Sequence, residues 1–180
     1  MLDGVRPPVT VSRRALLPDG SGGRFRQLVS DLLTISVRML ELRNHLATLM
    51  RVTGPQYSIV LTVAYFQATG GASVRAVAHQ LHVSSAFITS ETGKLVHRGY
   101  LAKRPNPADR RSVLLTLTRR GAALVESVVP HIRAVNDTFF GALSARDFND
   151  LSRLLGAMVT DSERALSGAR LRHAAVSSAS

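Results

Sequence analysis

The 180-residue sequence contains no cysteine. This absence excludes a disulfide framework, a zinc site built on thiolates, a cysteine nucleophile and redox sensing through a thiol. Long apolar runs are also missing, since none reaches the roughly 18 residues that a membrane-spanning helix requires. Hydrophobic residues still make up 45% of the chain, which is enough for a folded core. We therefore expect a globular protein of one or two domains that does not span a membrane.

Acidic residues are scarce. The chain has 12 Asp and Glu against 23 Lys and Arg, which gives a formal net charge of +11. Such an excess of positive charge indicates a polyanionic partner. Nucleic acid is the first candidate and an anionic membrane surface is the second.

The sequence also lacks the motifs of common enzymes: a nucleophile elbow, a Gly-rich phosphate loop and paired carboxylates. His79 and His82 have an i, i+3 spacing that could recruit a metal together with His45 or His131. No acidic residue adjoins the pair, however, and lone histidines are usually surface or core residues. We expect no catalytic residues, no metal site and no cofactor.

Residues 1–24 mix proline, glycine and arginine without periodicity, which is typical of a flexible basic arm. The arm either touches DNA or has no role. Arg13 and Arg14 do not form a twin-arginine signal, because Pro18 interrupts the short apolar stretch that follows them. We expect a cytoplasmic protein.

A long helix is predicted from Leu28 to about Arg51, because apolar residues recur there at steps of four and three. These residues are Leu28, Leu32, Ile35, Met39, Leu42, Leu46 and Leu49. Val29, Leu33 and Leu40 widen the apolar face beyond what one short neighbouring helix would cover. The face packs either against a partner subunit or within the chain.

Three shorter helices follow, at residues 55–68, 74–81 and 85–97. Pro55 suits the first position of a helix, and Ser73 and Ser84 can cap the second and third helices. The last two helices are joined by about three residues and are followed by a basic hairpin. This order is typical of a winged helix-turn-helix domain.

The hairpin extends over residues 100–121. Tyr100 and Leu101 open one strand, residues 113–117 form the return strand, and prolines mark the loop between them. From Arg98 to Arg120 there are seven Lys or Arg residues and one acid, Asp109. The charge suits a finger that enters a phosphate-lined groove, and it equally suits a solubilising surface hairpin.

Two helices complete the chain. Thr118 can cap the first, in which Pro130 predicts a kink near Glu126. Its inner residues are Ala122, Val125, Val128, Ile132, Val135 and Phe139. Ser144 and Asp147 resemble a capping box that opens the last helix. We expect this last helix to bury Phe148, Leu151, Leu154, Leu155, Met158 and Val159.

Residues 106–121, NPADRRSVLLTLTRRG, resemble the wing signature of the MarR (multiple antibiotic resistance regulator) family, with its Asp-x-Arg and its terminal Leu-Thr-x-x-Gly. Residues 95–101, LVHRGYL, look like the usual end of that family's recognition helix. The helix order matches over residues 28–166. The resemblance implies a mainly α fold with a small β-wing, a homodimer joined through the first and last helices, and usually a repressor released by a small ligand.

The expected organisation follows from this resemblance. It comprises a flexible arm at 1–24, a dimerisation helix at 25–54, the winged helix-turn-helix domain at 55–121, dimerisation helices at 122–167 and a flexible tail at 168–180. One departure concerns Glu91 and Thr92, which occupy positions that are commonly apolar in the family. Gly93 follows them and costs about 1 kcal/mol of helix propensity relative to alanine, which leaves the geometry of the recognition helix open.

The residues expected to contact DNA lie on the recognition helix and the wing. The hydroxyls of Ser84 and Ser85 suit phosphates or base edges at a helix N-terminus, although Ser84 is mainly a cap. With Val83, Ile88 and Leu95 pointing inward, the groove-facing candidates are Ser85, Phe87, Ser90 and Lys94. For the wing residues Asp109, Arg110 and Arg111, the family pattern implies that Arg111 enters the minor groove while Asp109 orients it.

By family analogy, an effector pocket would lie between the first, second and kinked helices. Its candidate residues are Arg38, Met39, Arg43, His45, Tyr57 and Val60. The same analogy alone implies that the ligand is an aromatic acid or an acyl-CoA thioester. Arg43 is equally compatible with an exposed helix position.

The sequence therefore predicts a dimeric, ligand-responsive regulator that binds a pseudo-palindromic operator in double-stranded DNA, with no membrane partner. The alternative is an architectural or non-specific DNA-binding protein without a small-molecule effector, which would use the same positive charge.

Overall fold

The structure, a computed structural model, describes residues 7–107, 109 and 112–177, and it describes side chains as far as residue 172. The chain forms two compact units, Met1–Arg133 and Ala134–Ser180, which are described separately. The elements of the first unit are η1 (Arg14–Leu16), α1 (Gly23–Leu49), α2 (Gly54–Phe66), η2 (Gln67–Thr69), β1 (Ala72–Ser73), α3 (Val74–Gln80), α4 (Ser85–His97), β2 (Leu101–Pro105) and β3 (Val113–Leu117). Helix α5 (Arg119–Phe139) begins in this unit and ends in the second, which also contains α6 (Ala145–Ser177).

Side-chain caps fix where the helices of the first unit begin. The Ser73 hydroxyl accepts a hydrogen bond from the Ala76 N–H at 3.1 Å, and the Thr118 hydroxyl accepts from the Gly121 N–H at 3.0 Å. Both caps are predicted from the sequence and are confirmed. At the start of α2, Thr53 and Gln56 form a reciprocal capping box, and Pro55 lies between them in the first turn of the helix.

The sheet has three strands in the order β1-β3-β2, and all neighbours are antiparallel. The hairpin pairs Leu101 with Leu117 and Pro105 with Val113, so the predicted wing strands are confirmed. Strand β1 is not predicted, because two residues carry no alternation pattern. Gly71, just before β1, has a φ of +113°, and a Cβ there would lie 2.6 Å from the Leu115 carbonyl oxygen. Glycine therefore allows the chain to reach β3.

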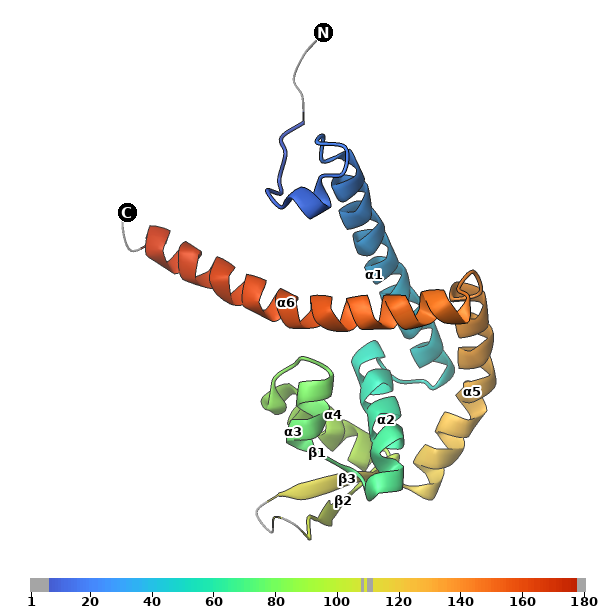
Figure 1. Cartoon of the computed structure of the whole chain (residues 1–180). Coiled ribbons are helices and arrows are strands. Elements are labelled where there is room, and N and C mark those ends of the chain that lie inside the picture. Colours follow the sequence, from blue (N-terminus) through green and yellow to red (C-terminus); the bar gives the residue numbers. More distant parts are fainter. Residues whose placement is uncertain (1–6, 108, 110–111, 178–180) are drawn as a thin grey trace. The chain divides into compact units, whose positions relative to one another are not determined.

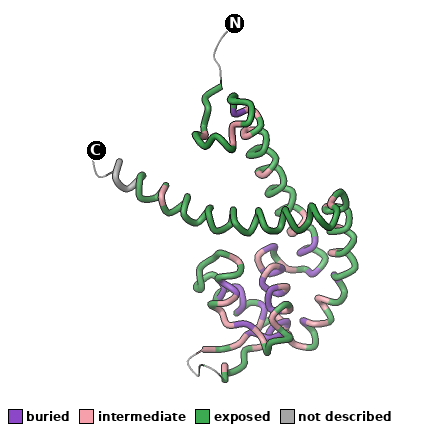
Figure 2. The backbone as a smooth tube through the Cα atoms, in the orientation of Figure 1, coloured by how far each residue is buried: buried purple, intermediate pink, exposed green. Residues whose placement is uncertain are grey.

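The core of the first unit is built around α2, which contacts α1, α3, α4 and β3 (Figure 1). Burial is concentrated there (Figure 2). Side chains from every neighbouring element contribute to it: Met50, Ile59, Val60, Val63, Val77, Ile88, Leu95 and Leu115 are each at most 1% exposed. The recognition helix and the wing are thus mounted on one continuous apolar core.

Helix α1 is buried only near its C-terminus, where Leu46, Ala47 and Met50 join the core. Most of the rest of its predicted apolar face is exposed in the single chain, and Leu32 and Leu42 are half-buried. Leu28, Leu33, Ile35, Met39 and Leu40 are between 45% and 63% exposed. The face is therefore not covered within the described chain.

In the second unit, Ser144 and Asp147 form the predicted capping box of α6. The Asp147 N–H donates to the Ser144 hydroxyl at 3.2 Å, and the Ser144 N–H donates to Asp147 Oδ2 at 3.1 Å. Hydrogen bonding from the Ser144 side chain and backbone lowers the pKa of the Asp147 carboxyl. Helix α6 continues to Ser177, beyond the predicted start of a flexible tail, because residues 168–177 are rich in alanine and arginine, which favour helix.

The predicted burial along α6 is wrong for the single chain. Phe148, Leu151, Leu154, Leu155, Met158 and Val159 are between 36% and 58% exposed. One helix cannot bury its own apolar face, so burial here requires a partner. Helix α5 is continuous through Pro130, and the kink expected near Glu126 stays a prediction. Among the described residues, no helix combines the length and the apolar character needed to cross a membrane.

Candidate nucleic-acid interface

The recognition helix α4 begins with a side-chain cap. The Ser84 hydroxyl accepts a hydrogen bond from the Phe87 N–H at 3.2 Å, which confirms Ser84 as the cap. The preceding turn contains His82, which adopts a left-handed backbone with a φ of +52°. The Val83 N–H bonds to the Ala78 carbonyl at 3.0 Å and closes this turn. Two short helices are thereby held in helix-turn-helix geometry.

The outer face of α4 carries the four residues proposed to face the groove: Ser85, Phe87, Ser90 and Lys94 are all exposed. Ile88 and Leu95 are fully buried, as predicted. Val83 does not point inward, because it is 40% exposed at the end of the left-handed turn. The orientation of α4 suits base reading, and the role of each outer residue stays a prediction.

The polar pair Glu91 and Thr92 lies on the inner face, where Glu91 is 9% exposed and Thr92 is fully buried. Hydrogen bonds satisfy both side chains. Glu91 accepts from Gln56 at 2.9 Å and also pairs with Lys94, and the Thr92 hydroxyl donates to the Ile88 carbonyl at 2.7 Å. The hydrogen bond from Lys94 and, to a smaller extent, the one from Gln56 lower the pKa of Glu91, whereas its burial acts in the opposite direction. Helix α4 is continuous through Gly93.

The wing loop between β2 and β3 is closed by hydrogen bonds across its base. The Asn106 side-chain amide donates to the Ser112 hydroxyl at 2.9 Å, and that hydroxyl donates to the Asp109 carbonyl at 3.1 Å. Asp109 is exposed. The predicted DNA contacts Arg110 and Arg111 lie outside the described residues, and so does the Arg111 partner expected for the Asp109 carboxylate.

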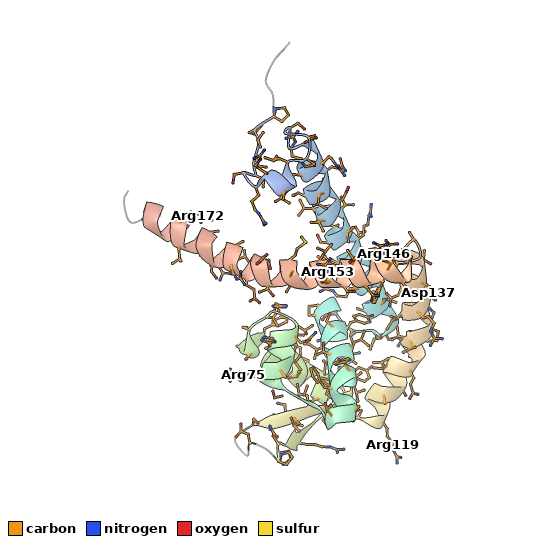
Figure 3. All side chains as sticks on the ribbon, viewed as in Figure 1. Arg75, Arg119, Asp137, Arg146, Arg153 and Arg172 are labelled. Carbon is orange, nitrogen blue, oxygen red and sulfur yellow. The ribbon has the colours of Figure 1, made fainter. Side chains whose placement is uncertain are left out.

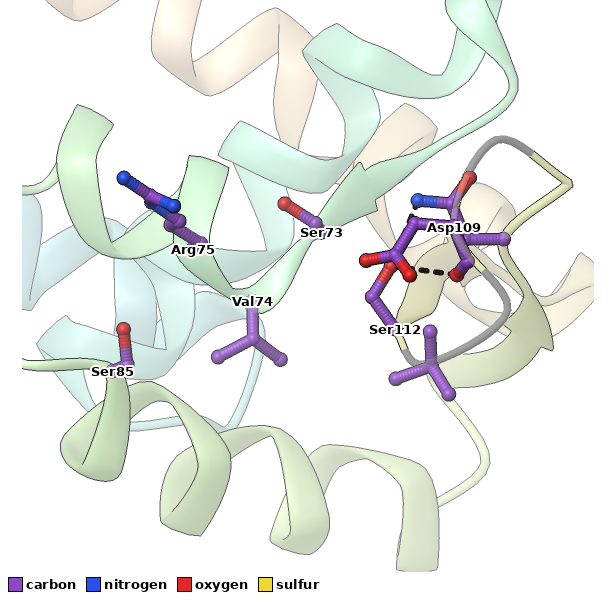
Figure 4. A pocket seen from close by; sticks show the side chains of 8 residues that line it. Ser73, Val74, Arg75, Ser85, Asp109 and Ser112 are labelled. Atoms are coloured by element: carbon purple, nitrogen blue, oxygen red, sulfur yellow. Dashed lines mark hydrogen bonds between the residues drawn. The ribbon is translucent and has the colours of Figure 1, made fainter.

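A pocket of about 490 Å³ opens where the wing, the start of α3 and the start of α4 meet. Its lining residues are Ser73, Val74, Arg75, Ser85, Asn106, Asp109, Ser112 and Val113. Figure 4 shows Arg75, Ser85 and Ser112 bordering it from three different elements. The guanidinium and the hydroxyls around this open hollow suit a phosphate group, whereas the Asp109 carboxylate on its wing side opposes one.

Arg75 is a candidate that sequence reasoning does not single out. It is exposed on α3 (Figure 3). A lone arginine on a short amphipathic helix carries no signal in the sequence. Only the packing of α3 beside the wing places Arg75 at the pocket.

Two of the hairpin cations that the structure describes have a structural role. The guanidinium carbons of Arg98 and Arg120 lie 4.9 Å and 5.1 Å from the centre of the Tyr100 ring. Arg98 also donates to the Arg51 carbonyl at 2.8 Å, which ties the end of α4 to the end of α1. These cations stabilise the base of the hairpin through cation–π contacts.

The six candidate effector residues occupy different environments. Arg38, Met39 and His45 are exposed, and Arg38 pairs with Glu41 at 2.8 Å. Tyr57 and Val60 are buried in the core, and burial raises the pKa of Tyr57. The Nε atom of Arg43 is buried without a hydrogen-bond partner among the described residues. The pockets at the wing, at the α5–α6 turn and beside Tyr65 are lined by other residues.

The His79 and His82 rings lie side by side, with centroids 6.3 Å apart. Within the part of the chain that the structure describes, no group of three or more His, Cys, Asp or Glu residues could hold a metal ion. The pair therefore has no third ligand among those residues.

Comparison with curated proteins finds helix-turn-helix transcriptional regulators, whereas no protein-family model matches the chain. The HTH-type transcriptional repressor NicR of Pseudomonas putida is 32% identical over 83 residues, which are 46% of this chain and 52% of NicR. The organic hydroperoxide resistance transcriptional regulator of Bacillus subtilis is 29% identical over 62% of this chain and 70% of that protein. The match thus spans about half of the first relative.

Solved structures share the architecture. A mutant MarR from E. coli complexed with operator DNA aligns over 75% of this chain and 95% of its own, with a TM-score of 0.61 and 21% identity. CouR from Rhodococcus jostii RHA1 bound to p-coumaroyl-CoA aligns over 72% of this chain and 90% of its own, with a TM-score of 0.64 and 21% identity. This chain is therefore a winged helix-turn-helix protein with the fold of the MarR family, and the sequence relatives named above are transcriptional regulators.

Proposed function

We propose that this protein is a dimeric transcriptional regulator that recognises an inverted-repeat operator through α4 and the wing. The observation that carries the proposal is the outer face of α4, where Ser85, Phe87, Ser90 and Lys94 are exposed. Ser85 also lines the pocket bordered by Arg75. Hydroxyl, ammonium and guanidinium groups there match the donors that position a protein on DNA.

Charge and fold support the same reading. The net charge of +11 favours a polyanion, and a helix-turn-helix places its second helix in the major groove. We assign Arg75 to phosphate contact, and Ser85, Phe87, Ser90 and Lys94 to the major groove. Following the family pattern, Arg111 is assigned to the minor groove and Asp109 to orienting it.

Dimerisation is proposed through α1 and α6. In one chain these helices leave large apolar side chains in water, including Leu33 at 63% exposure and Phe148 at 58%. Contiguous exposed apolar surface of this kind marks an association site. Two copies related by a two-fold axis would present two α4 helices to half-sites about one helical turn apart.

Repression and release by a small effector form the finer part of the proposal. NicR is named a repressor, and CouR was solved with p-coumaroyl-CoA. The unpartnered Nε of Arg43, close to α2, would suit an anionic group, whereas Tyr57 and Val60 would have to open from the core. An aromatic acid or an acyl-CoA thioester fits this chemistry.

An architectural DNA-binding protein is the competing function, because the same positive charge supports it. Footprinting on the promoter of its own gene separates the two. A protected pseudo-palindrome supports the regulator, while uniform affinity for unrelated duplexes supports the architectural protein. A screen of aromatic acids and their thioesters for release of the footprinted complex then tests the effector.

A further inference from the structure

A line of hydrogen bonds runs from the N-terminus of α2 to the outer face of α4. Gln56 stands in the first turn of α2, where its Oε1 accepts from the Thr53 N–H at 3.3 Å. The Nε2 atom of the same amide donates to Glu91 Oε2 at 2.9 Å. Glu91 Oε1 in turn accepts from Lys94 Nζ. Both oxygens of this nearly buried carboxylate are thus engaged, one from the core and one from the surface.

Core packing does not explain an acid at this position. Burying a carboxylate is costly unless it is paired, and an apolar residue of similar size would fill the same space at lower cost. The Gln56 amide holds Glu91 in one orientation, because the amide is itself fixed by the capping box. What the arrangement does supply is a rigid acceptor directly beneath the surface of α4.

The group that this acceptor holds is Lys94. Phe87, Ser90 and Lys94 follow one another at steps of three and four, so they share one face of α4. The Lys94 side chain is 59% exposed while its ammonium is paired with Glu91. A free lysine is a flexible point charge that attracts any phosphate, whereas a paired lysine is confined and locally neutralised.

We propose that Glu91 is a positioning residue for DNA recognition: it holds the Lys94 ammonium at one place on α4 and cancels its general attraction for phosphate, so that Lys94 contributes to discrimination between sequences. The proposal rests on the DNA-binding function proposed above. Non-specific affinity for DNA depends on the number of cations that are free to neutralise phosphates. While Lys94 is paired with Glu91, it does not add to that number.

The test uses the full-length protein and two duplexes, the sequence that the wild type selects from a random pool and a random sequence of equal length. Glu91→Gln retains the size of the side chain and one acceptor oxygen for the Gln56 amide, but it removes the charge and the second acceptor oxygen, which binds Lys94. Affinity for the random duplex should rise roughly fivefold, with a salt dependence steeper by about one unit of slope. The ratio of operator to random affinity should fall by roughly fivefold or more. An unchanged ratio would overturn the proposal.

Asp161→Asn is the matched control. It changes the net charge by the same amount at another acid–base pair with i, i+3 spacing, Asp161 to Arg164 at 3.3 Å in α6. This variant should leave the affinity ratio unchanged. If the ratio of operator to random affinity fell equally in both variants, net charge alone would explain the effect. That result would contradict a positioning role.

Lys94→Gln tests the same proposal at an exposed side chain. If Glu91→Gln does not fold, this variant decides the question. It should weaken operator binding by roughly tenfold and random binding by clearly less. Losses by the same factor on both duplexes would overturn the proposal. In the double variant, random-duplex affinity should return close to that of the wild type while the ratio stays low, because the freed cation is gone.

These outcomes separate the inference from the function on which it rests. A wild-type protein that selects no sequence contradicts the proposed function. A wild type that selects a sequence, combined with an unchanged ratio in Glu91→Gln, overturns only the role of Glu91.

Discussion

Gly121 lies so close to the backbone carbonyl of Tyr100 that a Cβ at this position would overlap the oxygen. Tyr100 precedes β2, and Gly121 stands in the first turn of α5. The Thr118 hydroxyl, which caps α5, also donates to the Gly99 carbonyl at 2.6 Å. The end of the recognition helix, the base of the wing and the start of α5 are therefore joined at one tight point.

Gly121→Ala should destabilise the protein by roughly 1 to 3 kcal/mol, because the added methyl group meets rigid backbone rather than a flexible side chain. Gly93→Ala is the matched control. Nothing lies within 4 Å of a Cβ built at Gly93, so this change should stabilise α4 by about 1 kcal/mol. Urea unfolding of both variants measures the difference, and equal stabilities would contradict the close approach.

Low pH should lower the stability of the folded protein, in part because Glu91 becomes protonated. Its pKa in the folded protein lies below the ordinary value of 4.5, chiefly because Lys94 donates a hydrogen bond to it. Folding therefore favours the ionised form, whose contribution is present above about pH 4.5 and is lost as the pH falls through the lowered pKa. The melting temperature of Glu91→Gln should fall less than that of the wild type between about pH 6 and about pH 3. Parallel curves for the two proteins would argue against an ionised Glu91 in the fold.

Much of the fold is readable from the sequence because its signals are local. Ser73, Ser84 and Thr118 cap the helices as predicted, and the β-branched and apolar run after the wing loop forms β3. The predicted site residues on α4 are exposed for the same reason, since helical spacing alone fixes which face they share.

The failures come from tertiary context. Helical spacing places Glu91 on the same face as Ile88, but its buried partner Gln56 lies 35 residues away in the sequence, so periodicity cannot reveal that contact. Strand β1 forms only because the backbone of β3 offers hydrogen-bonding partners. Arg75 reaches the wing pocket only through the packing of α3. The apolar residues of α6 are predicted to lie in a core, but the periodic pattern does not say which chain supplies the other side.

The protein should be a dimer at micromolar concentration, because α1 and α6 otherwise leave their apolar faces in water. Deleting residues 145–180 should leave aggregated or unfolded material. Light scattering on the full-length and truncated proteins tests this expectation. A well-folded full-length monomer would refute the proposed assembly.

The wing should bind through Arg111. Arg111→Ala should weaken operator binding by roughly 1 to 3 kcal/mol, since a delocalised cation suits the focused potential of a narrow minor groove. Asp109→Ala should also weaken binding if Asp109 orients Arg111, and the double variant should lose little more than Arg111→Ala alone. Affinities are compared at one salt concentration. Tighter binding by Asp109→Ala, as a simple charge effect requires, would exclude the orienting role.

Selection of binding sites from random duplex DNA, with the mass of the selected complex measured afterwards, tests the central claim most directly. We expect an inverted repeat whose half-site centres lie about 10 base pairs apart, occupied by two chains. Enrichment of asymmetric sites only, or of no sequence at all, would contradict a two-fold symmetric regulator that reads DNA through α4 and the wing.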